Sequence, residues 1–216
     1  MKKIALILCV CGVFAAFSTS LQADTFGQAF TGAASGLQLA NGPFTLGWSF
    51  DVKAPITVTS LAVYHDNGAT LLESHDVGIW NPNGNLVASA TVAPGGSCVA
   101  DQLGFQSWCT VGVNVTLAPG IYLIGALWNS FLDPLIFPGT LTNEGIAAVN
   151  GPGVIFLQDQ YIFGGTLTDP TFSTGENQAY FGANFAYRMG SIPEPASLFL
   201  LGTGLLGLGR LVRKKR

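Results

Sequence analysis

The chain has 216 residues, of which 49% are hydrophobic, 10% are charged and 28 are glycine, so it is too apolar to be disordered and long enough for one sizeable core. The net charge of −3 hides a segregation, because seven of the nine cations lie at the chain ends and only Lys53 and Arg188 lie within residues 24–190, beside eleven carboxylates. A body with a formal charge of −9 cannot neutralise phosphates, which excludes nucleic acid as a partner.

Residues 1–23 have the three parts of a secretory signal peptide. Two lysines open the segment, a 14-residue apolar stretch follows at 4–17, and small and polar residues precede Ala23. We predict a signal helix that signal peptidase removes after Ala23, with cleavage after Ser20 as the alternative. A retained anchor is a weaker interpretation, because 14 residues fall short of the roughly 20 that a membrane-spanning helix needs.

The body, residues 24–190, reads as short apolar and β-branched segments between turn residues, without a helical period. In residues 111–117 apolar and polar side chains alternate, which places one face on a core. Turns are predicted at 81–85 and at 119–120. The pattern predicts an all-β domain, an antiparallel, jelly-roll-like β-sandwich. The predicted strands are 44–52, 56–64, 77–80, 86–92, 110–117, 121–128, 145–149, 154–157, 161–166 and 179–188.

A histidine-aspartate pair at 65–66 recurs at 75–76, and we interpret the segment between them as one β-hairpin. Asp66, Asn67 and Glu73 supply oxygen atoms near a glycine turn and are candidate calcium ligands. We favour an Asx turn instead, because two carboxylates fall short of the six to eight oxygens that calcium takes. Zinc held by both histidines is less favoured still, since spacing supplies no third ligand.

Cys98 and Cys109 are the two cysteines that remain after signal removal. An exported pair is expected to be oxidised, so we predict a structural disulfide that stabilises the fold by about 3 kcal/mol. A redox-active pair is disfavoured by the absence of a CxxC spacing and of a neighbouring cation.

We predict no enzyme, because the chain lacks GxSxG, HExxH and phosphate-cradling GKS or GKT sequences. A glycosidase needs two facing carboxylates, and the sequence does not show whether any converge; the candidates are Asp133, Glu144, Asp159, Asp169 and Glu176. Aromatic side chains stack on sugar rings where they are exposed. We expect Trp48, Trp80 and Trp128 in the core and Trp108, in the disulfide loop, at the surface.

The last 26 residues form a tail with three parts. A proline-flanked acidic tripeptide comes first, an apolar segment at 196–212 follows, and a basic cluster ends the chain. Seventeen residues make about 25 Å of helix, so the segment spans a membrane narrowly, with its basic end on the cytoplasmic side. The tripeptide is Pro193, Glu194 and Pro195; the cluster is Arg213, Lys214, Lys215 and Arg216.

This order of parts resembles the PEP-CTERM sorting signal of Gram-negative bacteria. The resemblance implies that an exosortase, a membrane protease, recognises the tail in the inner membrane and passes the protein to the cell surface or extracellular matrix. Tails of this kind have also been labelled an ice-binding-protein C-terminal domain, a label that describes the tail and gives no evidence of ice binding. The alternative is an ordinary C-terminal transmembrane anchor whose prolines break the chain before the helix.

Residues 47–129 resemble an exported β-sandwich domain of unknown function that often precedes this tail, on the strength of Gly78–Asn81, 86–92 and 117–122. That resemblance implies an architecture and no activity. The sequence thus predicts an exported, non-enzymatic protein whose sandwich has a structural or interaction role, without a cofactor unless calcium binds. The alternative function is a carbohydrate-binding module for matrix polysaccharide, and the acidic body favours neutral sugars.

Overall fold

A computed structural model describes residues 24–31, 38–39, 42–65, 71–130, 132–136, 148–173 and 181–190. The predicted signal peptide and the sorting tail lie outside these residues. Every regular element within the described ranges is a β-strand, and all paired strands are antiparallel, which confirms the all-β prediction. Across the same ranges, no helix has the length and apolar character needed to cross a membrane.

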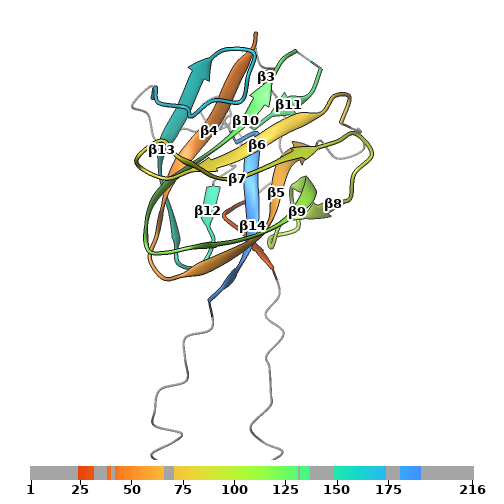
Figure 1. Cartoon of the computed structure of the whole chain (residues 1–216). Coiled ribbons are helices and arrows are strands. Elements are labelled where there is room, and N and C mark those ends of the chain that lie inside the picture. Colours follow the sequence, from red (N-terminus) through yellow and green to blue (C-terminus); the bar gives the residue numbers. More distant parts are fainter. Residues whose placement is uncertain are drawn as a thin grey trace, which may run out of the picture.

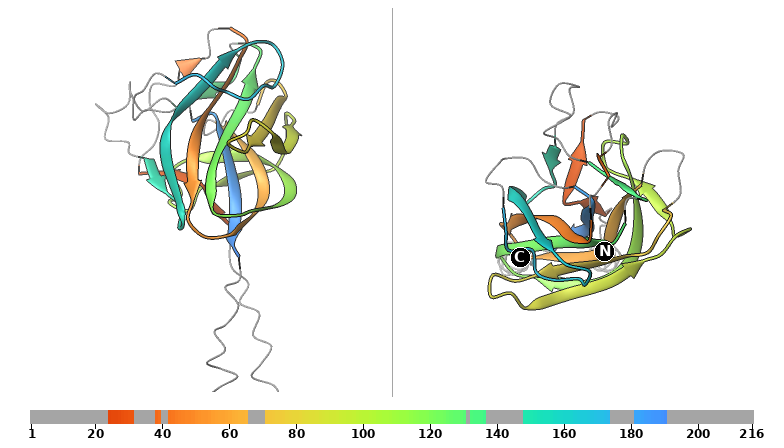
Figure 2. Two further views of the ribbon diagram at one scale, coloured as in Figure 1. Left: turned by 60° about the vertical axis from the view of Figure 1, so that its left-hand side comes forward. Right: turned by 90° about the horizontal axis from the view of Figure 1, so that it is seen from above.

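Ten strands form two five-stranded sheets (Figures 1 and 2). The β5 sheet has the order β1 (Thr25–Phe26), β14 (Ala183–Met189), β5 (Ile56–His65), β9 (Ser107–Leu117) and β8 (Cys98–Ala100). The β4 sheet has the order β13 (Val154–Phe163), β4 (Phe44–Val52), β10 (Gly120–Trp128), β6 (His75–Trp80) and β7 (Leu86–Val92). Two short pairs join β3 (Gln38–Leu39) to β11 (Pro134–Leu135) and β2 (Gln28–Phe30) to β12 (Ala148–Asn150).

The order of eight of these strands is that of a jelly roll. In chain order they are β1, β4, β5, β6, β7, β9, β10 and β14. The β5 sheet contains the first, eighth, third and sixth, and the β4 sheet contains the second, seventh, fourth and fifth. The strands β8 and β13 extend one edge of each sheet. Successive strands therefore cross between the sheets several times.

Aromatic side chains join the two sheets across a common core. The Trp48 ring stacks on the Phe185 ring with their centroids 5.8 Å apart, and Phe50 lies 4.7 Å from the same ring. The Trp48 indole N–H donates a 2.8 Å hydrogen bond to the Ala183 carbonyl of the opposite sheet. These side chains are fully buried, so burial of large aromatic area is the main source of cohesion between the sheets.

Most of the predicted strands are present in the structure, with small differences in their first or last residue. The strands β4 and β7 have the predicted limits, and β5, β6, β9 and β10 are extended by one to three residues at one end. The predicted strands 154–157 and 161–166 are one strand, β13, because a bulge between Phe156 and Gln158 interrupts the alternation of side chains. Of the segments 145–149 and 179–188, the described parts lie in or beside β12 and β14. The short strands β1, β2, β3, β8 and β11 were not predicted.

The predicted hairpin between the two histidines is wrong. His65 ends β5, and His75 begins β6 in the other sheet. The connection 66–74 therefore crosses from one sheet to the other, as the jelly-roll order requires. The sequence suggests a hairpin because the same His-Asp dipeptide occurs on both sides of the connection, at 65–66 and at 75–76, although the connection is longer than most hairpin loops.

The sandwich has two ends of different character, which we call the terminal end and the loop end. Asp24 and Gly190 lie at the terminal end, where the Arg188 guanidinium pairs with the Asp24 carboxylate. The loop end is opposite, where Phe44 is in register with Trp128 on one side and Phe163 on the other. In Figure 1 the terminal end is at the bottom and the loop end at the top.

Residues 164–173, which we call the strap, follow β13 and lie against the face of the β4 sheet that points away from the core. The Thr168 N–H donates a hydrogen bond of 3.2 Å to Thr45 Oγ1, and the buried Pro170 lies over Gly125. Gly125 is in register with Gly47 and Gly78 on the two adjacent strands. The absence of a side chain at Gly125 gives the strap room to approach the sheet at Pro170.

Candidate functional site

The sorting residues Pro193, Glu194 and Pro195 and the basic cluster at 213–216 lie outside the described residues. Within the described residues, the loop end gathers most of the remaining candidates: a buried polar cluster, the disulfide loop and a row of exposed aromatic rings.

The buried polar cluster joins the connection 71–74 to residues 127–133. His75 is fully buried, and its two ring nitrogens lie 2.9 Å from the Leu127 carbonyl oxygen and 3.0 Å from Asp133 Oδ2. A carbonyl oxygen can only accept, so Nδ1 carries a proton and donates. The Nε2 atom and Asp133 Oδ2 form the second hydrogen bond, so both ring nitrogens of this buried histidine are paired. The Trp128 ring lies 4.3 Å from the imidazole.

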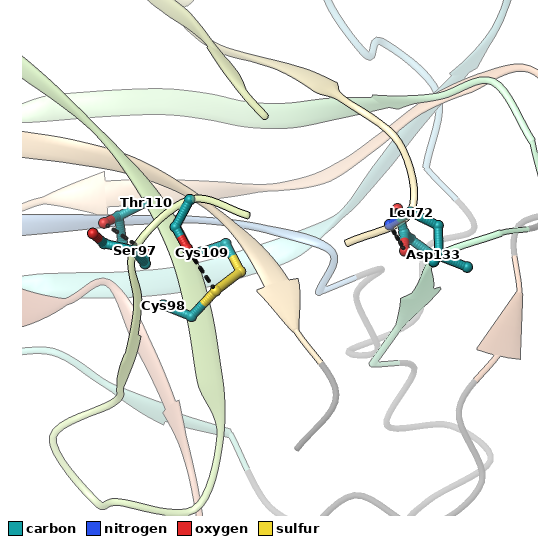
Figure 3. Close-up of a disulfide and its surroundings, with 7 residues drawn as sticks. Leu72, Ser97, Cys98, Cys109, Thr110 and Asp133 are labelled. Atoms are coloured by element: carbon teal, nitrogen blue, oxygen red, sulfur yellow. Dashed lines mark hydrogen bonds between the residues drawn. A yellow bond between two sulfur atoms is a disulfide. The ribbon is translucent and has the colours of Figure 1, made fainter. Parts of the chain in front are cut away.

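Asp133 also accepts backbone hydrogen bonds, so both oxygens of its carboxyl group have partners within the protein. The Leu72 N–H donates to Oδ1 at 2.8 Å, and the Glu73 N–H donates to Oδ2 at 3.0 Å. Figure 3 shows Asp133 beside Leu72. Glu73 in turn accepts a 2.9 Å hydrogen bond from the Ser130 hydroxyl. The cluster therefore fastens two loops that are about sixty residues apart in sequence.

The ligand atoms of Glu73, His75 and Asp133 lie within 4.8 Å of one another, which is compatible with a metal ion. Because protein donors already occupy these atoms, an ion would have to displace them. Of the predicted calcium ligands, Glu73 belongs to this cluster, whereas Asp66 and Asn67 lie outside the described residues. Zinc shared by both histidines is not supported by the geometry, since His65 belongs to a second group with the two cysteines.

The disulfide loop closes at the loop end through Cys98 and Cys109, which the structure joins as predicted (Figure 3). The Thr110 N–H donates to the Ser97 carbonyl at 2.9 Å beside the disulfide. Because both sulfur atoms are bonded to each other, the group that they form with His65 is not a metal site.

Asp101 holds the tip of the same loop. The backbone N–H groups of Leu103 and Gly104 donate to its Oδ1 at 3.0 and 2.8 Å, and the Phe30 N–H donates to Oδ2 at 3.1 Å. The carboxylate is buried, although nothing in the sequence distinguishes it from a surface residue. It ties the disulfide loop to the N-terminal strands.

The prediction that Trp108 is exposed is wrong. Its side chain is fully buried, because β9 begins at Ser107 and places Trp108 within the sheet. Phe26 and Phe30 cover the ring at centroid distances of 6.0 and 6.1 Å. Trp48, Trp80 and Trp128 are buried as predicted.

The other carboxylates considered for glycosidase chemistry are dispersed. Asp159 is buried on β13, where its Oδ1 accepts a 2.8 Å hydrogen bond from the Ser173 hydroxyl. Asp169 lies on the strap, and burial raises the pKa of its carboxyl above the ordinary 3.8. Its Oδ1 is buried without a hydrogen-bond partner among the described residues. Glu144 and Glu176 lie outside those residues.

Four aromatic rings form a row at the loop end, which we call the aromatic row: Phe44, Tyr161, Phe163 and Phe172. Phe163 is 69% exposed and Phe172 is 53% exposed, whereas Phe44 and Tyr161 are half-buried and pack against the core. The ring centroids of Phe44 and Phe163 are 4.8 Å apart, and Tyr161 lies 5.9 Å from both Phe163 and Phe172. The amino-acid sequence alone does not reveal this row, because its members come from three segments.

Two family models match parts of the chain. Residues 31–118 match a domain of unknown function, DUF4082, and residues 191–215 match the PEP-CTERM protein-sorting motif. Both resemblances identified from the sequence are thereby supported, and neither match concerns ice binding. No curated protein and no solved structure matches the chain.

Proposed function

Because this chain is a PEP-CTERM protein with a DUF4082 domain, we propose that it is delivered by an exosortase-type system to the cell surface or extracellular matrix, where its sandwich has a non-enzymatic interaction or structural role. The sorting motif marks an exported protein that passes through the membrane. Signal peptidase and exosortase are the proposed processing partners. The matched tail is the single observation that carries this proposal.

The position of the chain ends supports it. The described chain starts at Asp24 and stops at Gly190, and the ion pair of Asp24 with Arg188 keeps both points at the terminal end. A tail that starts at residue 191 therefore leaves from that end. During transit the membrane lies on the side of the terminal end, and the loop end is the part presented outward.

The chemistry of the carboxylates supports a role without catalysis. Asp133 and Asp159 are buried and accept hydrogen bonds from protein donors. A glycosidase needs a carboxyl group that is free to protonate the leaving group and another that faces the same bond. Asp133 and Asp159 are instead used to fasten loops and strands.

The sorting proposal is tested by replacing residues 193–195 with alanine and following the full chain by cell fractionation. We expect the variant to remain unprocessed in the inner-membrane fraction, whereas a control variant with alanine at Asn114 and Thr116, two exposed positions on β9, is processed like the native protein. Normal processing and surface delivery of the tripeptide variant would overturn the proposal.

A second candidate function, carbohydrate binding, is favoured by the exposed aromatic rings at the loop end. We propose no cofactor for this function. Calcium held by Asp66, Asn67 and Glu73 is retained as a hypothesis and is tested below.

A further inference from the structure

We infer that the aromatic row is a binding surface for a neutral polysaccharide, on which Phe163 and Phe172 contact the apolar faces of separate sugar rings. The two ring planes are inclined to each other, since the Tyr161 ring lies at 85° to Phe163 and at 38° to Phe172, so the row suits a twisted chain. The inference deepens the carbohydrate-binding candidate by assigning it a site. It rests on exposure, on rigidity, on charge and on the position of the row relative to the tail.

The exposure of these rings is unusual for their type. Phenylalanine is a residue that proteins mostly bury, yet Phe163 is 69% and Phe172 is 53% exposed. The two rings are linked through Tyr161 in a continuous row rather than scattered singly. A contiguous apolar surface of this kind marks an interaction site.

The row is held rigidly by backbone pairing. Phe163 is in register with Phe44 on β4, and Tyr161 exchanges two backbone hydrogen bonds with Phe172, of 2.8 and 3.0 Å. Beyond β13, the chain turns at Gly164, whose N–H donates to the Pro43 carbonyl at 3.0 Å. Rings that are fixed before binding lose little conformational freedom on binding.

Charge selects the class of polymer. Residues 24–190 contain two cations, Lys53 and Arg188, and both lie at or near the terminal end, away from the row. An anionic polysaccharide finds no basic partner on the described surface of the row and is repelled by the acidic body. Neutral sugars have no such penalty, and their C–H groups form an apolar face that matches an aromatic ring.

The direction of the row fits a polymer outside the cell. Phe163 and Phe44 lie at the loop end, and the tail starts from the terminal end. A body held by its tail therefore presents the aromatic row toward the matrix. Binding at the terminal end would instead require polymer next to the membrane.

The test uses the full-length chain purified in a mild detergent and sedimented with insoluble cellulose, chitin or curdlan, three neutral polysaccharides, and with calcium-gelled alginate as the anionic polymer. We expect retention on at least one neutral polymer and none on alginate. The double variant Phe163→Ala with Phe172→Ala is expected to lower the affinity for the polymer at least tenfold, because the apolar area that the two rings bury against the sugar is lost. Phe163→Tyr with Phe172→Tyr should retain binding.

Phe105→Ala is the matched control, since Phe105 is 44% exposed in the disulfide loop and outside the row. It should bind like the native protein. The inference is overturned if none of the three neutral polysaccharides retains the protein, or if alginate retains it more strongly than they do. It is also overturned if the double alanine variant binds as well as the Phe105→Ala control while its thermal unfolding is the same as that of the native protein. Alanine at residues 193–195 should leave binding intact, so failure of the sorting proposal and failure of this one are distinguishable.

Discussion

The two ends of the sandwich are stabilised in different ways. At the terminal end, turns are closed by near neighbours: Asn81 Oδ1 accepts from the N–H groups of Asn83 and Asn85 at 2.9 and 3.1 Å. At the loop end, Asp133 accepts from the Leu72 N–H, 61 residues away in sequence, and Asp101 accepts from the Phe30 N–H, 71 residues away. The turn at 81–85 is thus closed by local bonds, whereas the buried carboxylates at the loop end also bond across long sequence separations. The long-range ion pair at the terminal end, between Asp24 and Arg188, is exposed.

The sharpest test of this contrast is Asp133→Asn. The substitution replaces one carboxyl oxygen with an amide NH2 group, which cannot accept the buried hydrogen bonds from Leu72, Glu73 or His75, so we expect the free energy of unfolding to fall by about 3 to 5 kcal/mol. Urea denaturation measures it. Asp76→Asn is the control, because Asp76 accepts a hydrogen bond from the Thr91 hydroxyl at an exposed position and its change should stay within about 0.5 kcal/mol. Equal losses for both variants would contradict the contrast.

Removal of the disulfide should have the next largest effect. We expect the double variant Cys98→Ala with Cys109→Ala to lose about 3 kcal/mol, because the unfolded chain is no longer constrained. Denaturation of the native protein with and without a reducing agent should give the same difference. The reducing agent should leave the double variant unchanged, and any response there would have another origin.

A substitution in a turn at the terminal end should cost less. Gly84 has a φ of 76°, a conformation that side chains with a Cβ rarely adopt, so we expect Gly84→Ala to lower the stability by about 1 to 2 kcal/mol. Gly112 has space for a Cβ and no positive φ, and Gly112→Ala is the control that should cause no loss. A larger loss at Gly84 than at Asp133 would reverse the comparison of the two ends.

Asp169 connects the two ends, since the strap starts at the loop end and brings the Asp169 carboxylate next to Gly84. Its pKa is raised in the folded state above 3.8, so the folded state binds the proton more tightly than the unfolded state. Stability therefore decreases as the pH rises through the interval above 3.8. We expect Asp169→Asn to raise the melting temperature at pH 7 and to leave it nearly unchanged at pH 3. An equal shift at both pH values would argue against desolvation as the cause.

Calcium should have the smallest effect. Glu73 already accepts from Ser130, and its neighbour Asp133 accepts from three groups, so we expect millimolar calcium to leave the melting temperature of the full-length protein unchanged. A calcium-dependent rise that Asp66→Ala abolishes would establish the calcium hypothesis instead.

The sequence predicts the regular part of this fold well. The alternation of apolar and polar residues, together with the turn residues, gives β4 and β7 with their observed limits, because this alternation is a local property of the sequence. The crossing between His65 and His75 is not predictable in this way. Whether two neighbouring strands pair in one sheet or pass to opposite sheets depends on partners that are distant in sequence.

The candidate sites also differ in whether local sequence reveals them. The sorting tripeptide is contiguous, and the cysteine pair is the one pair left after signal removal, so the sequence identifies both. Asp133 was considered only as a possible acid, because its partners Leu72 and His75 come from another segment. The exposure of Phe163 and the burial of Trp108 depend on which segments cover each strand, and no single stretch of sequence contains that information.

Gly125 on the β4 sheet lies close beneath the strap. A Cβ on Gly125 would lie 2.8 Å from Thr45 Cγ2 and 3.3 Å from Pro170 Cγ, so an alanine there requires both side chains to shift. Pro170 precedes Phe172 by two positions. The missing side chain at residue 125 thus lets the strap lie close to the sheet two residues before an exposed ring of the aromatic row.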